Sequence, residues 1–193
     1  MQTSIFGKLL LVGVCAVAGV AAWGQQAPAS KPSLEVAIVY HAALGNPVAK
    51  DDFWMQGGSV QLHGQFWHGL GVVADVAGLH TANMKGSGVG LDLVTATFGP
   101  RYTWTSHYRH TALFGQVLAG EANGLHSVFP APSGSTVNAN SLALLMGGGI
   151  NVPLQRRFSV RAFEAEWLRT QLPNSTTNVQ NNLRLGAGLA YRF

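Results

Sequence analysis

Two carboxylates, Glu164 and Glu166, stand at alternate positions of one strand-like segment. Alternate side chains of a strand point to the same side and lie roughly 7 Å apart. Such a spacing could in principle serve an acid and base pair of the kind that cleaves glycosidic bonds. The alternative is a structural pair held by basic side chains. The choice between the two depends on the elements that position the carboxylates.

Seven histidines invite a metal-site hypothesis, which their spacing does not support. His107 and His110 flank one short turn, His63 and His68 lie across another, and neither an HExxH motif nor a cysteine accompanies them. Ser159 has no histidine within its run, so a serine hydrolase site is not expected either. We therefore expect no catalytic residue, no cofactor site and no metal site.

Apolar and polar residues alternate along eight segments, which predicts strands. The expected strands span residues 34–41, 59–66, 70–77, 92–104, 111–120, 141–152, 158–168 and 182–193. Most charged residues of these segments share one side, with Ala162 on the same side of its strand. This predicted charge network consists of Glu35, Asp75, Arg101, Glu164, Glu166, Arg184 and Arg192. The other side carries aliphatic and aromatic residues.

Three details of these strands refine the prediction. Pro100 would cost a ladder hydrogen bond, so a bulge or bend is expected there. The segment 111–120 has mixed faces, and its orientation stays open. If the last two strands are joined by residues 169–181, Glu166 lies opposite Arg184, and closure of the sheet brings Arg192 near Glu35.

Connections of two lengths alternate along the chain. Short links near 67–69, 105–110 and 153–157 separate long ones at 42–58, 78–91, 121–140 and 169–181. An up-and-down barrel in the bacterial outer membrane has this order, with short periplasmic turns and long exterior loops. A soluble barrel of the lipocalin kind would have to bury the charge network and expose leucines. The lumen of an eight-stranded barrel is just filled by side chains and admits little substrate, which favours structural carboxylates.

The N-terminal residues indicate export. Residues 1–24 combine Lys8 with an apolar run from Leu9 to Ala22 and read as a cleavable signal peptide. The run of about 15 residues is shorter than the roughly 20 that a membrane helix needs. Cys15 lies inside this run, which disfavours a lipoprotein anchor. We expect a flexible leader over 25–33 and a barrel over 34–193.

Composition agrees with this division. Without Lys8 the chain has eleven Lys and Arg against eight Asp and Glu, a net charge of +3, and these residues are dispersed. Nucleic-acid binding is therefore not expected. The chain has 24 glycines, 47% hydrophobic residues and 10% charged residues. A barrel with an apolar outer face and a narrow interior suits this composition.

Three blocks of sequence resemble small bacterial outer-membrane barrels of the outer membrane protein A and X type, and the porin-like outer-membrane β-barrel domain. The blocks are Phe98–Tyr102, Gly147–Pro153 and Gly186–Phe193. The resemblance implies an integral outer-membrane location, contact with outer-membrane lipid and lipopolysaccharide, and insertion by the barrel-assembly machinery. It also implies that Tyr191 and Phe193 form the assembly signal, although Gly186 stands where that signal usually has a polar residue.

The sequence thus predicts an all-β protein, an eight-stranded antiparallel transmembrane β-barrel preceded by a cleavable signal peptide. We expect a non-enzymatic role, either structural or in surface interactions, through the long exterior loops. The sequence does not identify the partner of these loops. One alternative is a narrow porin-like channel for small solutes or ions. The other is a lipid-acting enzyme, which would need a Ser/His pair at one depth on the lipid face.

Overall fold

The computed structural model describes residues 33–45, 52–84, 88–105, 111–132, 134–174 and 177–193. The expected signal peptide and nearly all of the expected leader lie outside these residues, as do His107 and His110. Among the described residues no helix is long and apolar enough to cross a membrane. The strands are β1 (Ser33–Gly45), β2 (Phe53–Trp67), β3 (Leu70–Thr81), β4 (Leu91–Thr105), β5 (Ala112–Leu125), β6 (Phe129–Ala131), β7 (Gly134–Thr136), β8 (Ala139–Pro153), β9 (Phe158–Thr170) and β10 (Gln180–Arg192).

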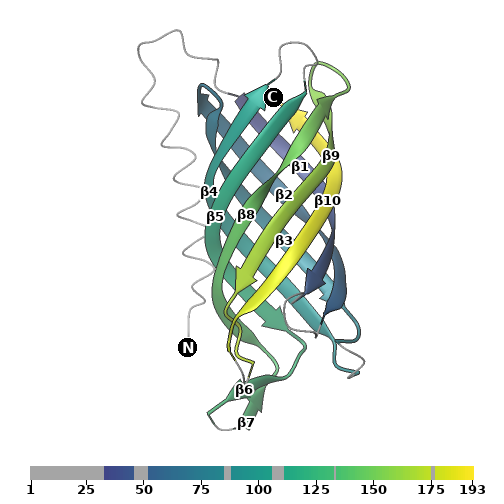
Figure 1. The fold of residues 1–193 in the computed structure, drawn as a ribbon, viewed down its shortest axis with the longest axis vertical. Helices are drawn as coiled ribbons and strands as arrows, with labels where there is room; N and C mark the ends of the chain where they lie inside the picture. Colours follow the sequence, from purple (N-terminus) through teal and green to yellow (C-terminus); the bar gives the residue numbers. More distant parts are fainter. Residues whose placement is uncertain (1–32, 46–51, 85–87, 106–110, 133, 175–176) are drawn as a thin grey trace.

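Eight of these strands form one closed antiparallel barrel in the order β1-β10-β9-β8-β5-β4-β3-β2. The predicted eight-stranded antiparallel barrel is confirmed. Closure comes from the pairing of β1 with β10, so each edge strand finds a partner. The short β6–β7 hairpin projects from one end of the barrel, and the C-terminus lies at the other (Figure 1). We call these the loop end and the turn end.

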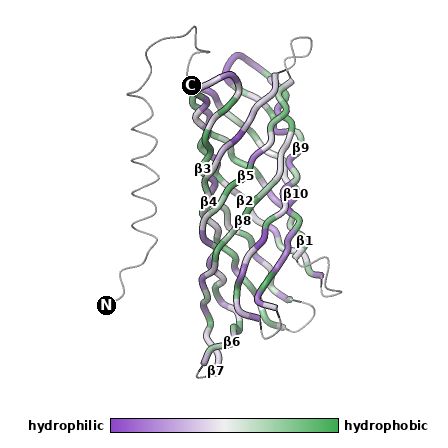
Figure 2. Tube along the Cα trace, turned by 60° about the vertical axis from the view of Figure 1, so that its left-hand side comes forward, coloured by the Kyte–Doolittle hydropathy of each residue, from purple (hydrophilic) through white to green (hydrophobic). Residues whose placement is uncertain are grey.

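Side chains alternate between a buried and an exposed side along the barrel strands. Figure 2 shows hydrophobic and hydrophilic residues mixed along the strands, as this alternation requires. In β1, for example, Glu35, Ala37 and Val39 are buried, whereas Ile38 and Tyr40 are 66% and 57% exposed. The outward positions of all eight strands form an apolar band around the barrel.

The strands run further toward the loop end than the sequence predicts. Segments expected within loops, such as 42–45, 53–58, 78–81 and 121–125, belong to β1, β2, β3 and β5. The outward residues of these extensions are mixed, because polar residues and glycines stand beside apolar ones such as Leu44 and Trp54, and this hid their strand character from a search for apolar alternation. The polar ones form a polar belt beyond the apolar band, to which β1 contributes no residue: Gln56, His80, Asp92, Glu121, Asn140, Arg169 and Asn181. The β6–β7 hairpin was also not predicted.

One irregularity in β9 changes the lumen. Gly186 pairs with Glu164 while Gly188 pairs with Arg161, and on the other side Ile150 pairs with Phe163 while Asn151 pairs with Arg161. β9 therefore holds one residue more than either neighbour, which is a β-bulge. The prediction that Ala162 faces the lumen was wrong: Ala162 is exposed, and Arg161 is buried instead.

The expected irregularity at Pro100 is absent from the register. Pro100 pairs with Val72 in an unbroken β3–β4 ladder, and the β4–β5 register is the same on both sides of it, at Phe98–Ala119 and Arg101–Gln116. Pro100 faces outward and is exposed. The prediction of a bulge there was wrong, because one missing donor needs no inserted residue.

The structure also orients β5, which the sequence left open. Phe114, Gln116 and Leu118 point into the barrel, and Leu113 and Val117 point out. The faces looked mixed because two large apolar side chains lie on the lumen side. Phe114 packs there against two arginines, and Leu118 belongs to an apolar cluster.

Candidate functional site: the lumen network and the mouth cavity

Arg184 is the centre of one group of lumen ion pairs. Its Nε and Nη2 donate to Oε2 of Glu166 at 2.8 and 2.5 Å, from the position directly opposite on β9. Nη2 also lies 3.3 Å from Oδ1 of Asp75, which comes from β3 across the lumen. One guanidinium therefore neutralises two carboxylates from two strands. All three side chains are 0–1% exposed.

Arg161, which the bulge turns inward, is the centre of a second group. Its Nη1 donates to Oε2 of Glu164 at 3.2 Å, and its Nη2 lies 3.5 Å from Oε1 of Glu35. Its Nε donates to Oδ1 of Asn151 at 3.0 Å, and Nη1 also reaches Oε1 of Gln61. Strict alternation from Glu164 places Arg161 on the outer face, so the sequence reading missed it.

Arg101 joins the network through neutral amides. It donates to Oε1 of Gln61 at 2.5 Å and, through Nε, to Oε1 of Gln116 at 2.7 Å. The amide nitrogens of these residues donate onward, from Gln61 to Glu164 at 3.0 Å and from Gln116 to Glu166 at 2.5 Å. Each glutamine thus accepts from a cation and donates to an anion, and the two groups of ion pairs become one network.

The ring of Phe114 packs against two of these cations. The guanidinium carbons of Arg101 and Arg161 lie 4.3 and 4.6 Å from its centroid. A cation over an aromatic face is attracted by the ring quadrupole. Phe114 therefore belongs inside despite its apolar character. Gly149 makes room for it, because a Cβ there would lie 2.8 Å from the ring.

Formal charges balance across this network. Glu35 also pairs with the half-exposed Arg192 at 3.2 Å, opposite it at the turn end. The four carboxylates are Glu35, Asp75, Glu164 and Glu166, and the four guanidiniums are Arg101, Arg161, Arg184 and Arg192. The seven residues that the sequence places in the lumen hold four acids and three arginines, and Arg161 supplies the fourth cation.

The network fills the lumen at its level. Arg101, Arg161, Arg184, Glu164 and Glu166 are each 0–1% exposed. Side chains that lined an open aqueous path would be accessible to water along it. These side chains instead contact one another across the barrel, as expected for eight strands.

One Ser–His pair, not predicted from the sequence, also lies in the lumen. Nε2 of His41 is 2.9 Å from Oγ of Ser59, the geometry of a nucleophile and its base. Among the described residues, however, Nδ1 of His41 has no hydrogen-bond partner, so no carboxylate orients the ring. Both residues are buried, at 0% and 4% exposure. This arrangement does not support acyl transfer.

Toward the loop end the lumen becomes apolar. Lumen-facing apolar residues of the barrel strands pack with residues of the connections into one apolar cluster. It comprises Ala43, Met55, Val73, Leu79, Leu91, Leu93, Leu118, Ala122, Phe129, Ala143, Leu145, Leu168 and Leu172. The outer face at this level carries the polar belt together with apolar residues such as Trp54.

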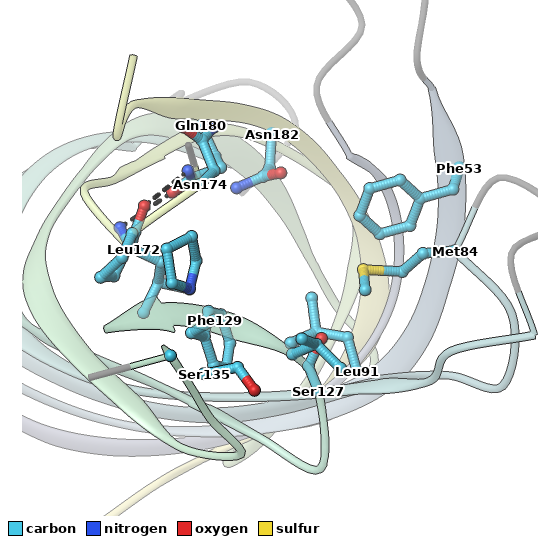
Figure 3. Close-up of a pocket in the computed structure, with 14 residues that line it drawn as sticks. Phe53, Met84, Leu91, Ser127, Phe129, Ser135, Leu172, Asn174, Gln180 and Asn182 are labelled. Atoms are coloured by element: carbon cyan, nitrogen blue, oxygen red, sulfur yellow. Dashed lines mark hydrogen bonds between the residues drawn. The ribbon is translucent and has the colours of Figure 1, made fainter. Parts of the chain in front are cut away.

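A cavity of about 570 Å³ opens above this cluster at the mouth of the barrel. Leu91, Phe129 and Leu172 belong to both the cluster and the cavity wall. Phe53 and Met84 lie on one side and Leu172 and Gln180 on the other (Figure 3). All four of the expected exterior loops supply lining residues. We call this space the mouth cavity.

Polar groups occupy one part of the mouth cavity wall. Gln180 is fixed by hydrogen bonds to the backbone N and O of Leu172, both at 2.9 Å, and to Thr170. Asn182 donates to the carbonyl of Leu168 at 3.3 Å, and Ser127 and Ser135 also line the space. None of the described lining residues carries a charge.

A bridged histidine pair stands outside the mouth cavity. Asp92 accepts from Nδ1 of His80 at 2.5 Å and from Nδ1 of His126 at 2.6 Å, joining β3, β4 and the segment that follows β5. Two hydrogen bonds hold the pKa of the Asp92 carboxyl below its usual value. The one from His80 has the larger effect and the one from His126 the next largest. Among the described residues no group of three or more His, Cys, Asp and Glu has the arrangement of a metal site.

Tyr191 and Phe193 lie on the outer face at the turn end. Their ring centroids are 4.9 Å apart, and Tyr191 is also 4.9 Å from Phe158. The backbone N of Phe193 donates to the carbonyl of Leu34 at 2.9 Å. That the barrel-assembly machinery recognises Tyr191 and Phe193 stays a prediction.

Comparison with solved structures agrees with this geometry. The chain is similar to Ail, the attachment invasion locus protein of Yersinia pestis, whose structure was solved in complex with the heparin analogue sucrose octasulfate. The comparison gives a TM-score of 0.53 and 16% identity, and it covers 84% of this chain and 99% of Ail. Neisserial surface protein A gives a TM-score of 0.53 and 12% identity over 86% of this chain and 100% of that chain. The fold is that of the small bacterial outer-membrane barrels. No protein-family model and no curated protein sequence matches the chain.

Proposed function

We propose that this protein is a non-conducting, non-enzymatic barrel of the bacterial outer membrane that presents its loop end at the cell surface. The apolar band faces lipid, including lipopolysaccharide in the outer leaflet, and the polar belt stands above it. The four connections at the loop end then meet the exterior, where they bind a partner. The expected export by a signal peptide at residues 1–24 is part of this proposal.

The observation that carries the proposal is the sealed charge network. A selective pore lined by charge displays rings of one sign along an open path. Here four carboxylates face four guanidiniums, and six of these side chains are 0–1% exposed. An internal plug of this kind supports an anchoring and presenting role over the channel alternative.

The structure of Ail contains a sulfated glycan analogue. Binding of such a polyanion requires a cluster of cations. None of the described residues that line the mouth cavity is charged. The proposed function therefore includes no polyanionic ligand at the mouth cavity.

Planar-bilayer recordings test the proposal. We expect no steady single-channel steps from the wild-type protein. The double variant Arg101→Ser, Arg161→Ser removes the two guanidiniums that pack on Phe114, and we expect it to leak ions, which shows that the recordings detect an opened lumen. Steady steps from the wild-type protein would overturn the plugged-barrel proposal in favour of a narrow channel.

A further inference from the structure

We propose that the mouth cavity is a blind binding site for a small uncharged molecule that has an apolar body and a hydrogen-bonding group. The inference extends the proposed function and rests on it in one respect, because the sealed network makes the site a dead end. The cavity binds and presents such a molecule at the cell surface and does not pass it through the barrel.

Size and shape support a small ligand. A cavity of about 570 Å³ falls within the roughly 300–1,000 Å³ of small-molecule sites. The apolar cluster forms its base, and its walls come from the ends of β2, β4 and β10 and from the β3–β4, β5–β8 and β9–β10 connections (Figure 3). The space is half-open toward the exterior, and a ligand would contact residues from several elements at once.

The lining decides the chemical class. Phe53, Met84, Leu91, Phe129 and Leu172 offer aliphatic and aromatic surface to a molecule in the cavity. Transfer of apolar surface from water to such a wall is favourable. An apolar body is therefore the part of the ligand that the cavity recognises most strongly.

The polar side of the wall adds direction without charge. Gln180 and Asn182 are held in place by backbone hydrogen bonds, and the hydroxyls of Ser127 and Ser135 lie on the hairpin side. Amides and hydroxyls both donate and accept, which suits a neutral alcohol, amide or ester group. A carboxylate, phosphate or sulfonate would enter a site whose described lining offers it no cation, at a desolvation cost.

Two dyes with the same aromatic skeleton provide the test. N-phenyl-1-naphthylamine is neutral, and 8-anilino-1-naphthalenesulfonate adds one sulfonate. Both brighten in apolar surroundings. The protein is purified from membranes, reconstituted in phospholipid nanodiscs and titrated with each dye, with empty nanodiscs subtracted. We expect saturable binding of the neutral dye at one site per barrel and at least tenfold weaker binding of the anionic dye.

Substitutions assign the binding to the mouth cavity. Leu172→Asp places a charge in the apolar wall, and we expect at least a tenfold loss of affinity. Leu154→Asp makes the same change at an exposed position in the opposite turn and should bind like wild type. Since Leu172 is buried, Ser135→Trp provides a second variant at an exposed position, where the indole should occupy the cavity and displace the dye. Val137→Trp, exposed and not part of the lining, is its control.

Three results would overturn the inference: no saturable binding above empty nanodiscs, wild-type affinity in both cavity variants, or tighter binding of the anionic dye. The heat-induced shift on gels shows whether each variant is folded. Conductance by the wild-type protein would instead overturn the plugged barrel and leave the dye result standing, so the two failures are distinguishable.

Discussion

At the scale of single residues, the lumen shows how seven charges can be buried in a narrow barrel, with the half-exposed Arg192 as an eighth at its turn end. Each guanidinium has five N–H donors in a fixed fork, so one arginine can satisfy several acceptors. Arg184 reaches two carboxylates, and Arg161 reaches two carboxylates and two amides. Gln61 and Gln116 carry these interactions to Arg101. The charges are tolerable only as a set, because removal of one leaves others without a partner.

The unequal connectivity of Glu166 and Arg184 predicts unequal effects of their loss. Glu166→Gln leaves Arg184 with Asp75, whereas Arg184→Gln leaves Asp75 and Glu166 buried without their cation. Breaking a buried pair costs about 3–5 kcal/mol, and we expect Arg184→Gln in this range and Glu166→Gln below it. The double variant should cost less than the sum. Urea unfolding from detergent measures all three, with Glu121→Gln in the polar belt as the control. Strict additivity would show that the two side chains act independently.

At the scale of strands, the alternation of apolar and polar residues predicted the barrel but neither the bulge in β9 nor the mouth cavity. The two-residue period of apolar side chains predicts the eight strands and their apolar outer face. The length of the 169–181 connection then places Glu166 opposite Arg184. The bulge in β9 does not follow from this period, because Ala162 and Phe163 are both acceptable on an outer face and nothing local marks the extra residue. The mouth cavity could not be predicted either, since its wall combines strand ends and connections that are far apart in the sequence and that the fold brings together.

The bulge makes a prediction whose sign separates two versions of β9. With the bulge, Arg161 is buried among Glu164, Glu35 and Asn151, and Arg161→Gln should cost about 3–5 kcal/mol of unfolding free energy. In a strictly alternating strand Arg161 would face lipid, where an arginine costs about 2–4 kcal/mol near the midplane, and the same substitution would stabilise the barrel. Arg156→Gln, in the exposed turn before β9, should lie within about 0.5 kcal/mol of wild type. Stabilisation by Arg161→Gln would contradict the bulge.

At the scale of the whole molecule, the barrel changes its polarity along its axis. Toward the turn end the charge network is inside and the apolar band is outside. Toward the loop end the apolar cluster is inside and the polar belt is outside. The first arrangement suits lipid and the second suits water, so one continuous set of strands crosses from one solvent to the other. The change also explains why the mouth cavity is apolar although it opens at the exterior.

Two outward positions on neighbouring strands test where this boundary lies. Val117 on β5 lies in the apolar band and pairs with Met146 on β8, whereas Asn140 lies six positions away from Met146 along β8, in the polar belt. At roughly 3.3 Å per residue and the usual strand tilt, the two differ in depth by about 15 Å. Val117→Arg should cost about 2–4 kcal/mol in lipid, because the guanidinium leaves water. Asn140→Arg should change the unfolding free energy by no more than about 0.5 kcal/mol, because it stays hydrated.

Unfolding in phospholipid vesicles measures both variants. The same pair in short-chain detergent is the control, since a thin and compliant micelle should shrink the cost of Val117→Arg. Equal costs in lipid would place the boundary elsewhere and would leave the polar belt inside the membrane.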